Sequence, residues 1–333
     1  MKKINIIISS LFLVLITFTN VNSDEKFNSW IIKFKKKAID EGISEKTVNI
    51  VMDNAIFLPK VIEYDRYQPE FYEDTKTYVS KRTSNDKVKK GKKIYKKNKN
   101  LINVVDEEFK VEKELLLALM GIETNYGTYL GKMDIISSLA TLSYDKRRSE
   151  FFTYELITIL KLIDENKINK NILFGSWAGA FGHFQFMPTT ISNYAIDYDN
   201  NSIIELKKEY DSFASAANYL NKIGWKKNDP CFFKIELKEN IPKKFLNTSA
   251  KKIINKKKFK FYKKFIKENE KYNISDKVKV AIVTPDSDIV KNNNKFDPAY
   301  LVFSNYDKVL KWNRSLRFAL AVCTLKNKFS NEL

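Results

Sequence analysis

The chain has 333 residues, of which 44% are hydrophobic, and a formal net charge of +19. This length and apolar content allow a sizeable core in one large or two modest domains, which excludes a disordered chain and one that lies in the membrane throughout. The single histidine, His183, has no acid or thiol at motif spacing. Sites built on several histidines are therefore excluded, and a packing role is favoured for this one.

The first residues are typical of an export signal. Lys2 and Lys3 precede an apolar segment over residues 6–16, and small residues follow at 21–23. Because the segment is short for a spanning helix, we predict a signal peptide over residues 1–23 and no stable membrane span after its removal. An uncleaved anchor is the alternative. No cysteine lies near the cleavage point, which disfavours a lipid anchor.

Helices dominate the first two thirds of the mature chain. Leu115–Ile122 is apolar on every face of a helix, so that helix is expected to be buried, and Gly127 is placed to end it. A glycine-rich loop is expected over residues 175–188. The other helices that apolar spacing predicts cover residues 29–41, 44–54, 74–82, 86–105, 137–144, 149–164, 189–194 and 210–223.

Alternating apolar residues predict a different structure after residue 225. Strands are expected over residues 232–237, 277–284 and 299–303, with a helix over 306–327. Between the first two strands lies a basic insert, 243–267, which is interpreted as helical. The fold class is therefore mostly α with a small strand-containing lobe, α+β overall. The predicted domains are a helical core over 24–225, the lobe over 226–305 and a C-terminal helix over 306–333 that returns to the core.

The two cysteines and the excess lysine leave alternatives open. Cys231 and Cys323 can pair in an oxidising compartment if their Cα atoms approach each other. Lysines gather at residues 87–99 and 243–267, and a basic surface favours polyanions. Export argues against nucleic acid and favours cell-wall glycans that carry peptide carboxylates, or lipid headgroups. The alternative is that these lysines only solvate the surface.

One acid stands out at the end of the buried helix. Glu123 follows the apolar run by one residue, and helical geometry puts Leu116, Leu119 and Met120 on its side. Desolvation against that wall raises the pKa of a carboxyl group, which can then hold a proton near neutral pH and donate it. The alternative is a carboxylate that pairs with one of the many lysines.

Several segments together resemble a known family. They are GIETNYG (121–127), SLATLSYDKRRSEFF (138–152), GSWAGAFGHFQFMP (175–188) and KWNRS (311–315). In order and spacing they resemble the lytic murein transglycosylase B family, glycoside hydrolase family 103. The resemblance implies a lysozyme-like, mostly α core and cleavage of the β-1,4 bond between N-acetylmuramic acid and N-acetylglucosamine in peptidoglycan.

In that family one glutamate, matched here by Glu123, performs both proton transfers. It protonates the glycosidic oxygen as an acid and then acts as a base toward the C6 hydroxyl of the muramic residue, which leaves a 1,6-anhydro end. Ordinary glycosidases need a second carboxylate beside the bond, and none is found in the glycine-rich loop or the C-terminal motif. A tethered hydroxyl removes that need.

The resemblance also implies a set of residues around the carboxyl and the sugar subsites. Ser176 and Asn313 match positions that hydrogen-bond around the catalytic carboxyl; alternatively Ser176 and Gln185 only satisfy backbone groups in a tight loop, and Asn313 caps a helix. Phe151 and Trp312 stand where relatives commonly carry tyrosine, so stacking is kept and a hydroxyl is lost. The full implied set is Tyr78, Arg147, Arg148, Glu150, Phe151, Ser176, Gln185, Met187, Tyr219, Trp312 and Asn313.

An acidic loop suggests a structural calcium site, although no cofactor is required for the chemistry. Asp197, Asp199 and Asn201 alternate like the start of an EF-hand, and some members of the family bind calcium here. Lys208 occupies the twelfth position, where a glutamate would close the shell, so Asp211 would have to supply that ligand. The alternative is a solvated acidic turn.

The sequence thus predicts a periplasmic lytic transglycosylase, exported across the inner membrane of a Gram-negative-type cell. Its expected partners are peptidoglycan strands and, beyond them, proteins of cell-wall synthesis or division. The alternatives are a lysozyme-type hydrolase on the same fold and a cell-wall-binding protein without activity. The hydrolase would differ in its products, and the binding protein in losing the acid or its supporting residues.

Overall fold

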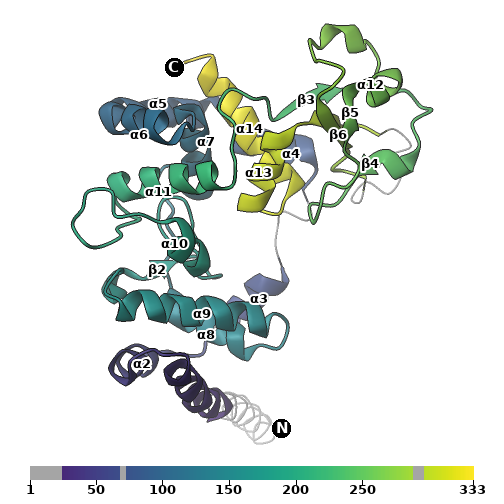
Figure 1. The fold of residues 1–333 in the computed structure, drawn as a ribbon. Coiled ribbons are helices and arrows are strands. Elements are labelled where there is room, and N and C mark those ends of the chain that lie inside the picture. The colour runs from purple at the N-terminus through teal and green to yellow at the C-terminus, as the bar shows by residue number, and fades with distance from the viewer. Residues whose placement is uncertain (1–24, 68–72, 288–295) are drawn as a thin grey trace, which may run out of the picture.

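A computed structural model describes residues 25–67, 73–287 and 296–333. The predicted signal peptide lies outside the described residues. Helices form a tall body, and a small lobe with a sheet projects from one side of it (Figure 1). None of the described helices is both long enough and apolar enough to cross a membrane.

The lower part of the body, as drawn in Figure 1, is a helical layer formed by the N-terminal segment and two central helices. The helix over residues 25–40 and α2 pack below α9, and Ser44 caps α2 by accepting a hydrogen bond from the backbone N–H of Thr47. A two-stranded antiparallel ribbon joins this layer to the glycine-rich loop. These elements are α2 (Glu45–Met52), α3 (Pro59–Arg66), β1 (Met133–Asp134), α8 (Ile135–Tyr144), α9 (Ser149–Asp164), η2 (Lys170–Ile172) and β2 (Phe174–Gly175).

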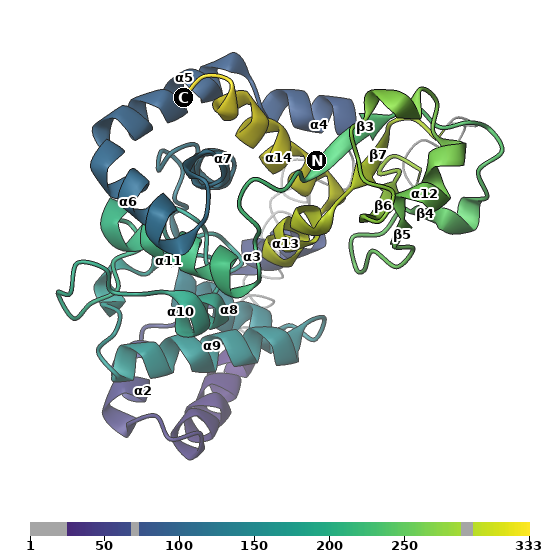
Figure 2. The ribbon, with the colours of Figure 1, turned by 45° about the horizontal axis from the view of Figure 1, so that its top comes forward.

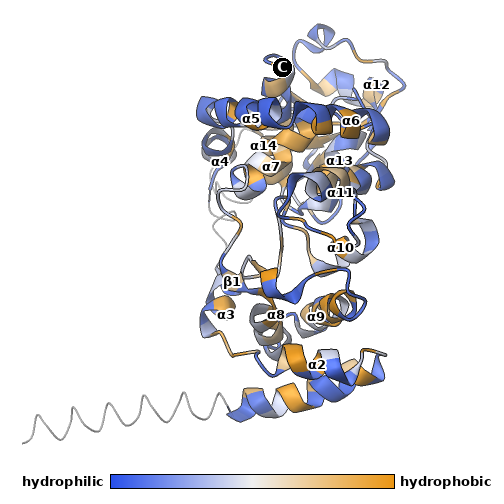
Figure 3. Ribbon diagram, turned by 90° about the vertical axis from the view of Figure 1, so that its left-hand side faces the viewer, coloured by the Kyte–Doolittle hydropathy of each residue, from blue (hydrophilic) through white to orange (hydrophobic). Residues whose placement is uncertain are grey.

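The upper part is built around α7 (Lys113–Thr124), the helix predicted to be buried. All residues from Leu115 to Gly121 are buried, which confirms that prediction. Figure 2 shows α5, α6 and α14 around α7, and Figure 3 shows apolar residues along α7 and α14 while the outer α5 is polar. The surrounding helices are α4 (Thr75–Arg82), α5 (Asn85–Lys97), α6 (Lys99–Phe109), α10 (Pro188–Tyr194), α11 (Glu209–Lys222), α13 (Ser304–Trp312) and α14 (Leu316–Ser330).

Two helices predicted as continuous are interrupted. The helix expected over 86–105 is two helices, α5 and α6, because Asn98 leaves the helical conformation and its backbone N–H donates to Ile94 and Tyr95. The helix expected over 306–327 divides into α13 and α14. There Ser315 caps α14 by accepting the N–H of Phe318, so the cap is not Asn313. Apolar spacing continues across both breaks, which is why it did not reveal them.

The lobe has a mixed sheet and a core of its own. The strand order is β3-β7-β6-β4, with β5 also paired to β6; β4 runs parallel to β6 and the other pairs are antiparallel. Phe259, Tyr262 and Leu301 are among the side chains of its core. The strands are β3 (Phe232–Ile235), β4 (Leu246–Asn247), β5 (Lys257–Lys258), β6 (Lys279–Val283) and β7 (Ala299–Val302).

All three predicted strands are therefore confirmed, whereas the helical interpretation of residues 243–267 was wrong. That segment holds β4, β5 and only short helical turns, because its apolar residues pack individually into the lobe core and do not follow one helical face. The short helices of the lobe are η3 (Lys243–Phe245), α12 (Phe259–Tyr262), η4 (Lys263–Phe265) and η5 (Asn269–Lys271).

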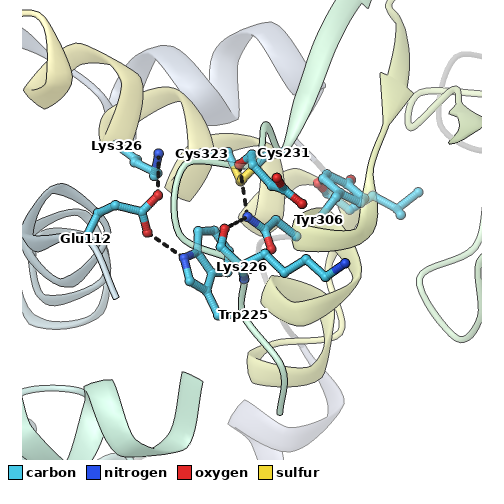
Figure 4. The surroundings of a disulfide bond; sticks show 10 residues. Glu112, Trp225, Lys226, Cys231, Tyr306, Cys323 and Lys326 are labelled. Atoms are coloured by element: carbon cyan, nitrogen blue, oxygen red, sulfur yellow. Dashed lines mark hydrogen bonds and ion pairs between the residues drawn. A yellow bond between two sulfur atoms is a disulfide. The ribbon is translucent and has the colours of Figure 1, made fainter. Parts of the chain in front are cut away.

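A disulfide ties the lobe to the helical body. Cys231, just before β3, is bonded to Cys323 in α14, with 6.1 Å between their Cα atoms. Figure 4 shows that the bond lies near Trp225 and Glu112, the residue that precedes α7. The indole N–H of Trp225 donates to Glu112 over 2.5 Å, and Lys326 of α14 lies 3.3 Å from the same carboxylate. The open question of cysteine pairing is answered in favour of a bond.

Candidate active site

The C-terminal end of α7 presents Glu123 on a sharply turned segment. Asn125 and Tyr126 both adopt the left-handed conformation, with φ of 50° and 62°, so the chain turns back at once after the helix. Lys87 of α5 donates to the carbonyl of Gly121 over 2.6 Å and to the side chain of Asn125 over 3.2 Å. A cation thus satisfies a carbonyl that the helix leaves without a partner, which favours this helix end.

The ring of Tyr126 folds back over the helix, which requires a glycine at position 121. A Cβ atom on Gly121 would lie 2.5 Å from the Tyr126 hydroxyl oxygen. Tyr126 is 8% exposed, so its ring covers the last turn of α7 from solvent. The two glycines of the GIETNYG motif therefore have different roles: Gly121 leaves room for a side chain, and Gly127 continues the left-handed turn at a φ of 78°.

The glycine-rich loop is fastened directly to this helix end. The hydroxyl of Thr124 donates to the carbonyl of His183 over 2.9 Å and accepts the N–H of Gly127 over 3.0 Å. His183 is buried, and its Nδ1 lies 3.4 Å from the hydroxyl of Ser212. Burial lowers the pKa of His183, which favours the neutral ring. The packing role predicted for this histidine is confirmed.

Within the loop, Ser176 and Gln185 bond to the backbone. The Ser176 hydroxyl accepts the N–H of Ala180 over 2.9 Å. The Gln185 amide donates to the carbonyl of Gly182 over 2.9 Å and reaches that of Leu130 at 3.4 Å. These are the bonds expected if both side chains stabilise a tight loop. A contact with the catalytic carboxyl or with sugar stays a prediction.

Trp312, at the end of α13, contacts the carboxyl of Glu123. Its indole N–H donates to Oε1 over 2.9 Å. The indole packs against Tyr219 and Phe186, with ring centroids 5.1 and 5.3 Å away. Tyr219 in turn donates its hydroxyl hydrogen bond to the carbonyl of Lys311 over 3.2 Å. Three residues that are far apart in the sequence, Glu123, Tyr219 and Trp312, are therefore adjacent.

Burial raises the pKa of Glu123 to about 8, while the hydrogen bond from Trp312 acts in the opposite direction. No salt bridge within the described ranges involves this carboxyl, so the alternative of a lysine partner is not what the structure shows. The direction of this shift agrees with the desolvation expected from the sequence, and the catalytic role of Glu123 stays a prediction. At neutral pH the group holds a proton and can donate it.

Arg147 and Arg148 bind an acid of the protein. The Nε of Arg147 donates to Asp65 over 2.6 Å, and Arg148 pairs with the other oxygen of the same carboxylate. Asp65 is 2% exposed, whereas the two arginine side chains remain 47% and 39% exposed. Both arginine side chains are therefore paired with Asp65 and still partly exposed.

The other residues implied by the resemblance occupy varied positions. Tyr78 is buried beneath the guanidinium of Arg82, 3.5 Å from the ring centroid. Phe151 is 46% exposed beside Phe152. Glu150 lines a hollow of about 520 Å³ on α9, together with Lys37 and Lys161. Met187 and Asn313 are partly buried, at the start of α10 and at the end of α13.

Three of the four residues in the predicted calcium loop converge. Carboxylate oxygens of Asp197, Asp199 and Asp211 all lie within 4.8 Å of one another. Asp211 is 1% exposed and accepts the backbone N–H groups of Tyr198 and Glu205. Burial and the nearby charge of Asp199 raise its pKa above the ordinary value.

Asn201 completes this loop in a different way. Its side-chain amide donates to Glu205 over 3.0 Å, and its backbone N–H donates to Asp197 over 3.0 Å. Oxygen donors concentrated in this way fit a hard divalent cation, which would offset their mutual repulsion.

This fold and site define the family. The sequence profile described as "Transglycosylase SLT domain" matches residues 26–327, so the chain belongs to the transglycosylase SLT domain family. Among curated proteins it is similar to the membrane-bound lytic murein transglycosylase B of Escherichia coli K12, with 35% identity over 153 residues. That alignment covers 46% of this chain and 42% of the relative, so the chain matches less than half the length of that protein.

Solved structures are similar over nearly the whole chain. SltB3 from Pseudomonas aeruginosa, in complex with NAG-NAM-pentapeptide, has a TM-score of 0.80 and 28% identity, and the match covers 91% of this chain and 79% of that one. The Escherichia coli lytic transglycosylase Slt35, in complex with calcium, has a TM-score of 0.74 and 23% identity over 90% and 92% of the two chains. The mostly α, lysozyme-like fold predicted from sequence is thereby confirmed.

Sequence reasoning missed three contacts of the site. They are the hydrogen bond from Trp312 to Glu123, the bond from Thr124 to the glycine-rich loop and the bond from Lys87 to Gly121. Each joins residues 34 or more positions apart, and a hydrogen-bond donor leaves no periodic signal. Trp312 was expected near the site only as a stacking surface.

Proposed function

We propose that this protein is a lytic murein transglycosylase that cleaves the β-1,4 bond between N-acetylmuramic acid and N-acetylglucosamine without water. The observation that carries the proposal is the partly buried carboxyl of Glu123, which has a raised pKa and accepts the indole N–H of Trp312, in a chain of the transglycosylase SLT domain family. An acid with a pKa of about 8 is protonated at neutral pH and matched to proton donation.

Glu123 acts twice in this reaction. It first gives its proton to the glycosidic oxygen as the bond from that oxygen to C1 breaks. The resulting carboxylate then removes the proton of the C6 hydroxyl, whose oxygen forms the new bond to C1. Burial supports the second step as well, because a carboxylate in an apolar site is a stronger base than one in water. The hydroxyl is held by the substrate itself, at high effective concentration.

The other residues would position the glycan. Tyr219 and Trp312 offer an aromatic surface next to the acid, and aromatic faces suit the apolar faces of sugar rings. The side chains of Arg147 and Arg148 stay partly exposed and could meet carboxylates of the peptide stems. Ser176, Gln185 and Met187 lie on the loop that would line the sugar subsites, as in the resemblance. We also propose that the protein works in the periplasm, after removal of the predicted signal peptide.

The test is mass spectrometry of the soluble products from purified peptidoglycan. The mature chain should release fragments with 1,6-anhydro-muramic ends, one water lighter than hydrolysis products. Glu123→Gln should lower the rate by about 10²- to 10⁴-fold, the usual contribution of a general acid. Products with reducing ends would indicate a hydrolase. Wall binding without release, by both proteins, would overturn the enzymatic proposal.

We further propose a structural calcium ion at the cluster of Asp197, Asp199 and Asp211, with Asn201 beside it. The support is the convergence of three carboxylates and the raised pKa of the buried Asp211. The ion would neutralise this loop and take no part in proton transfer. Calcium should raise the melting temperature of the wild type but not of Asp211→Asn. An equal response to magnesium, or none to either ion, would count against the site.

A further inference from the structure

We infer that Trp312 gives the two oxygens of Glu123 separate tasks: its indole N–H holds Oε1 as an acceptor, so the proton that the reaction moves is carried on Oε2. The inference rests on the proposed function for its catalytic meaning. It also makes a structural claim that can be tested without substrate.

The chemistry of indole enforces this division. An indole N–H is a donor only, and it cannot accept a hydrogen bond or a proton. In a carboxylic acid the carbonyl oxygen is a better acceptor than the hydroxyl oxygen, so an N–H 2.9 Å from Oε1 favours Oε1 as the carbonyl oxygen. The O–H group of the protonated acid is then favoured on Oε2, and in the carboxylate Oε2 is the oxygen left to collect a proton. The same atom then serves as acid and as base.

The aromatic neighbours of Trp312 prevent the indole from turning away. Its ring is packed by Phe186 and Phe184 of the glycine-rich loop, the second at 6.2 Å between centroids, and by Tyr219 of α11. The Tyr219 hydroxyl holds the carbonyl of Lys311, one residue before Trp312. Side chains from the glycine-rich loop and from α11 thus fix the direction of one N–H bond, which makes Trp312 a positioning residue.

The hydrogen bond also adjusts the balance between the two steps. A donor that faces a carboxylate favours the ionised form, whereas burial favours the neutral form. Without Trp312 the acid would hold its proton more tightly and donate it less readily. With it, Glu123 stays near the pKa that allows both donation and removal of a proton.

Charged groups on the surrounding elements are engaged elsewhere and do not replace this donor. Burial and Trp312 are the influences that shift the pKa of Glu123 among the described residues. Three titratable groups on the neighbouring elements form hydrogen bonds: Lys87 of α5 with the Gly121 carbonyl, Tyr219 of α11 with the Lys311 carbonyl, and His183 of the loop with Ser212. Four others form ion pairs: Asp106 of α6 with Lys227, Glu209 of α11 with Lys97, and Arg317 and Lys326 of α14 with Asp286 and Glu112.

The first experiment needs no substrate. The chain has four tryptophans, so ¹⁵N-labelled protein gives four indole N–H signals, and Trp312→Phe identifies one of them by its loss. We expect that signal to move with a pH midpoint of about 8, the pKa of Glu123, and to be insensitive to pH in Glu123→Gln. A Trp312 signal that does not respond between pH 6 and 10 would overturn the inference, whatever the enzyme's activity.

The second experiment asks whether the hydrogen bond from Trp312 lowers the pKa of Glu123. In Trp312→Phe the ring stays and the N–H is lost, so the alkaline limb of kcat/KM should move upward by about one to two pH units. Trp312→Tyr, which restores a donor, should return the limb toward the wild type. Trp30→Phe is the matched control, because it makes the same exchange in the lower helical layer, where the indole packs against Phe27 and Phe34; we expect the limb in place. A limb that stays in place in Trp312→Phe as well would reduce Trp312 to a packing role.

Discussion

Two acids in this protein lie at helix ends away from full solvent exposure, and their pKa values are shifted in opposite directions. Glu123, at the end of α7, has a pKa raised to about 8 by burial, with one neutral donor from Trp312. Asp65, in the last turn of α3, is also buried. There burial opposes ionisation, but hydrogen bonds and charge from Arg147 and Arg148 outweigh it and lower the pKa of Asp65.

The difference lies in the donors, because Asp65 is 2% exposed and Glu123 is only partly buried, yet Asp65 is the acid whose pKa is lowered. Asp65 receives charged donors on both oxygens, and Arg147 also donates to its backbone carbonyl over 2.7 Å. A charged donor stabilises a carboxylate about twice as strongly as a neutral one. A buried acid is therefore kept ready to donate a proton by the neutrality of its neighbours. In a chain with a net charge of +19, the raised pKa of Glu123 therefore requires that no lysine pairs with its carboxyl group.

The largest expected effect is the pH dependence of stability at Glu123. Its folded pKa of about 8 lies above the ordinary value of 4.5, so the folded state favours the protonated form. The wild type should lose stability as pH rises from 4.5 through 8 and level off above it. Glu123→Gln lacks this loss, so its free energy of unfolding should exceed that of the wild type by roughly 3 to 5 kcal/mol at pH 9.

Urea unfolding of both proteins at pH 5, 7 and 9 measures this difference. Glu107→Gln is the control for loss of a negative charge, since its side chain is 74% exposed. It should leave the difference from the wild type near zero at every pH. A gap between Glu123→Gln and the wild type that does not widen with pH would mean that Glu123 is ionised like Asp65, and the contrast between the two acids would fail.

The opposite dependence is expected at Asp65. Its pKa lies below the ordinary value of 3.8, so its contribution is present above that pH and is lost as pH falls through the folded pKa. Asp65→Asn should cost about 2 kcal/mol at pH 7, since both arginines can still reach water. The cost should shrink as pH falls below 3.8.

Chemical denaturation at pH 7 and pH 3 checks this expectation. Asp145→Asn is the matched control, because Asp145 forms an ion pair with Arg66, whose side chain is 54% exposed. A surface pair of this kind is worth less than about 1 kcal/mol. If Asp65→Asn and Asp145→Asn lower the free energy of unfolding equally, the buried ion pairs of Asp65 contribute no more to stability than a surface pair.

The fold was predictable where one pattern extends over many residues. The apolar run of α7 and the alternating strands β3, β6 and β7 were found because each pattern reflects burial of a whole face. The breaks at Asn98 and at residues 313–315 were missed, since they depend on single caps that interrupt no pattern. The helical prediction for the basic insert, residues 243–267, was wrong because the structure of that segment depends on its packing against the lobe core, which is a tertiary effect.

The candidate site was predictable for the acid and less so for its supports. Glu123 could be found because an acid after eight apolar residues is conspicuous and desolvation follows directly from burial. The role of Trp312 was not accessible, because a donor's direction depends on the packing of three elements. Likewise, nothing in the order of the sequence shows that Asp65 holds Arg147 and Arg148, which are 82 and 83 residues away.

A third acid lies between the two extremes and gives the smallest effect. Glu155 of α9 is 1% exposed and accepts two neutral donors from Thr189, the backbone N–H over 2.8 Å and the hydroxyl over 2.7 Å. Burial raises its pKa, and the two hydrogen bonds only moderate the shift. If each neutral donor lowers the pKa of a buried acid, Thr189→Val should raise the pKa of Glu155 further. The variant should lower the free energy of unfolding by about 1 kcal/mol, and by more at pH 9 than at pH 6.

Thr190→Val, at the next position of α10, makes the same exchange of hydroxyl for methyl and serves as the control for helix propensity. Unfolding of both variants at the two pH values separates the effects. A cost at Thr189 that is independent of pH would mean that its hydroxyl only fills space. A pH-dependent cost would show that one neutral donor measurably favours a buried carboxylate, which is the effect that the comparison assigns to the indole of Trp312 on Glu123.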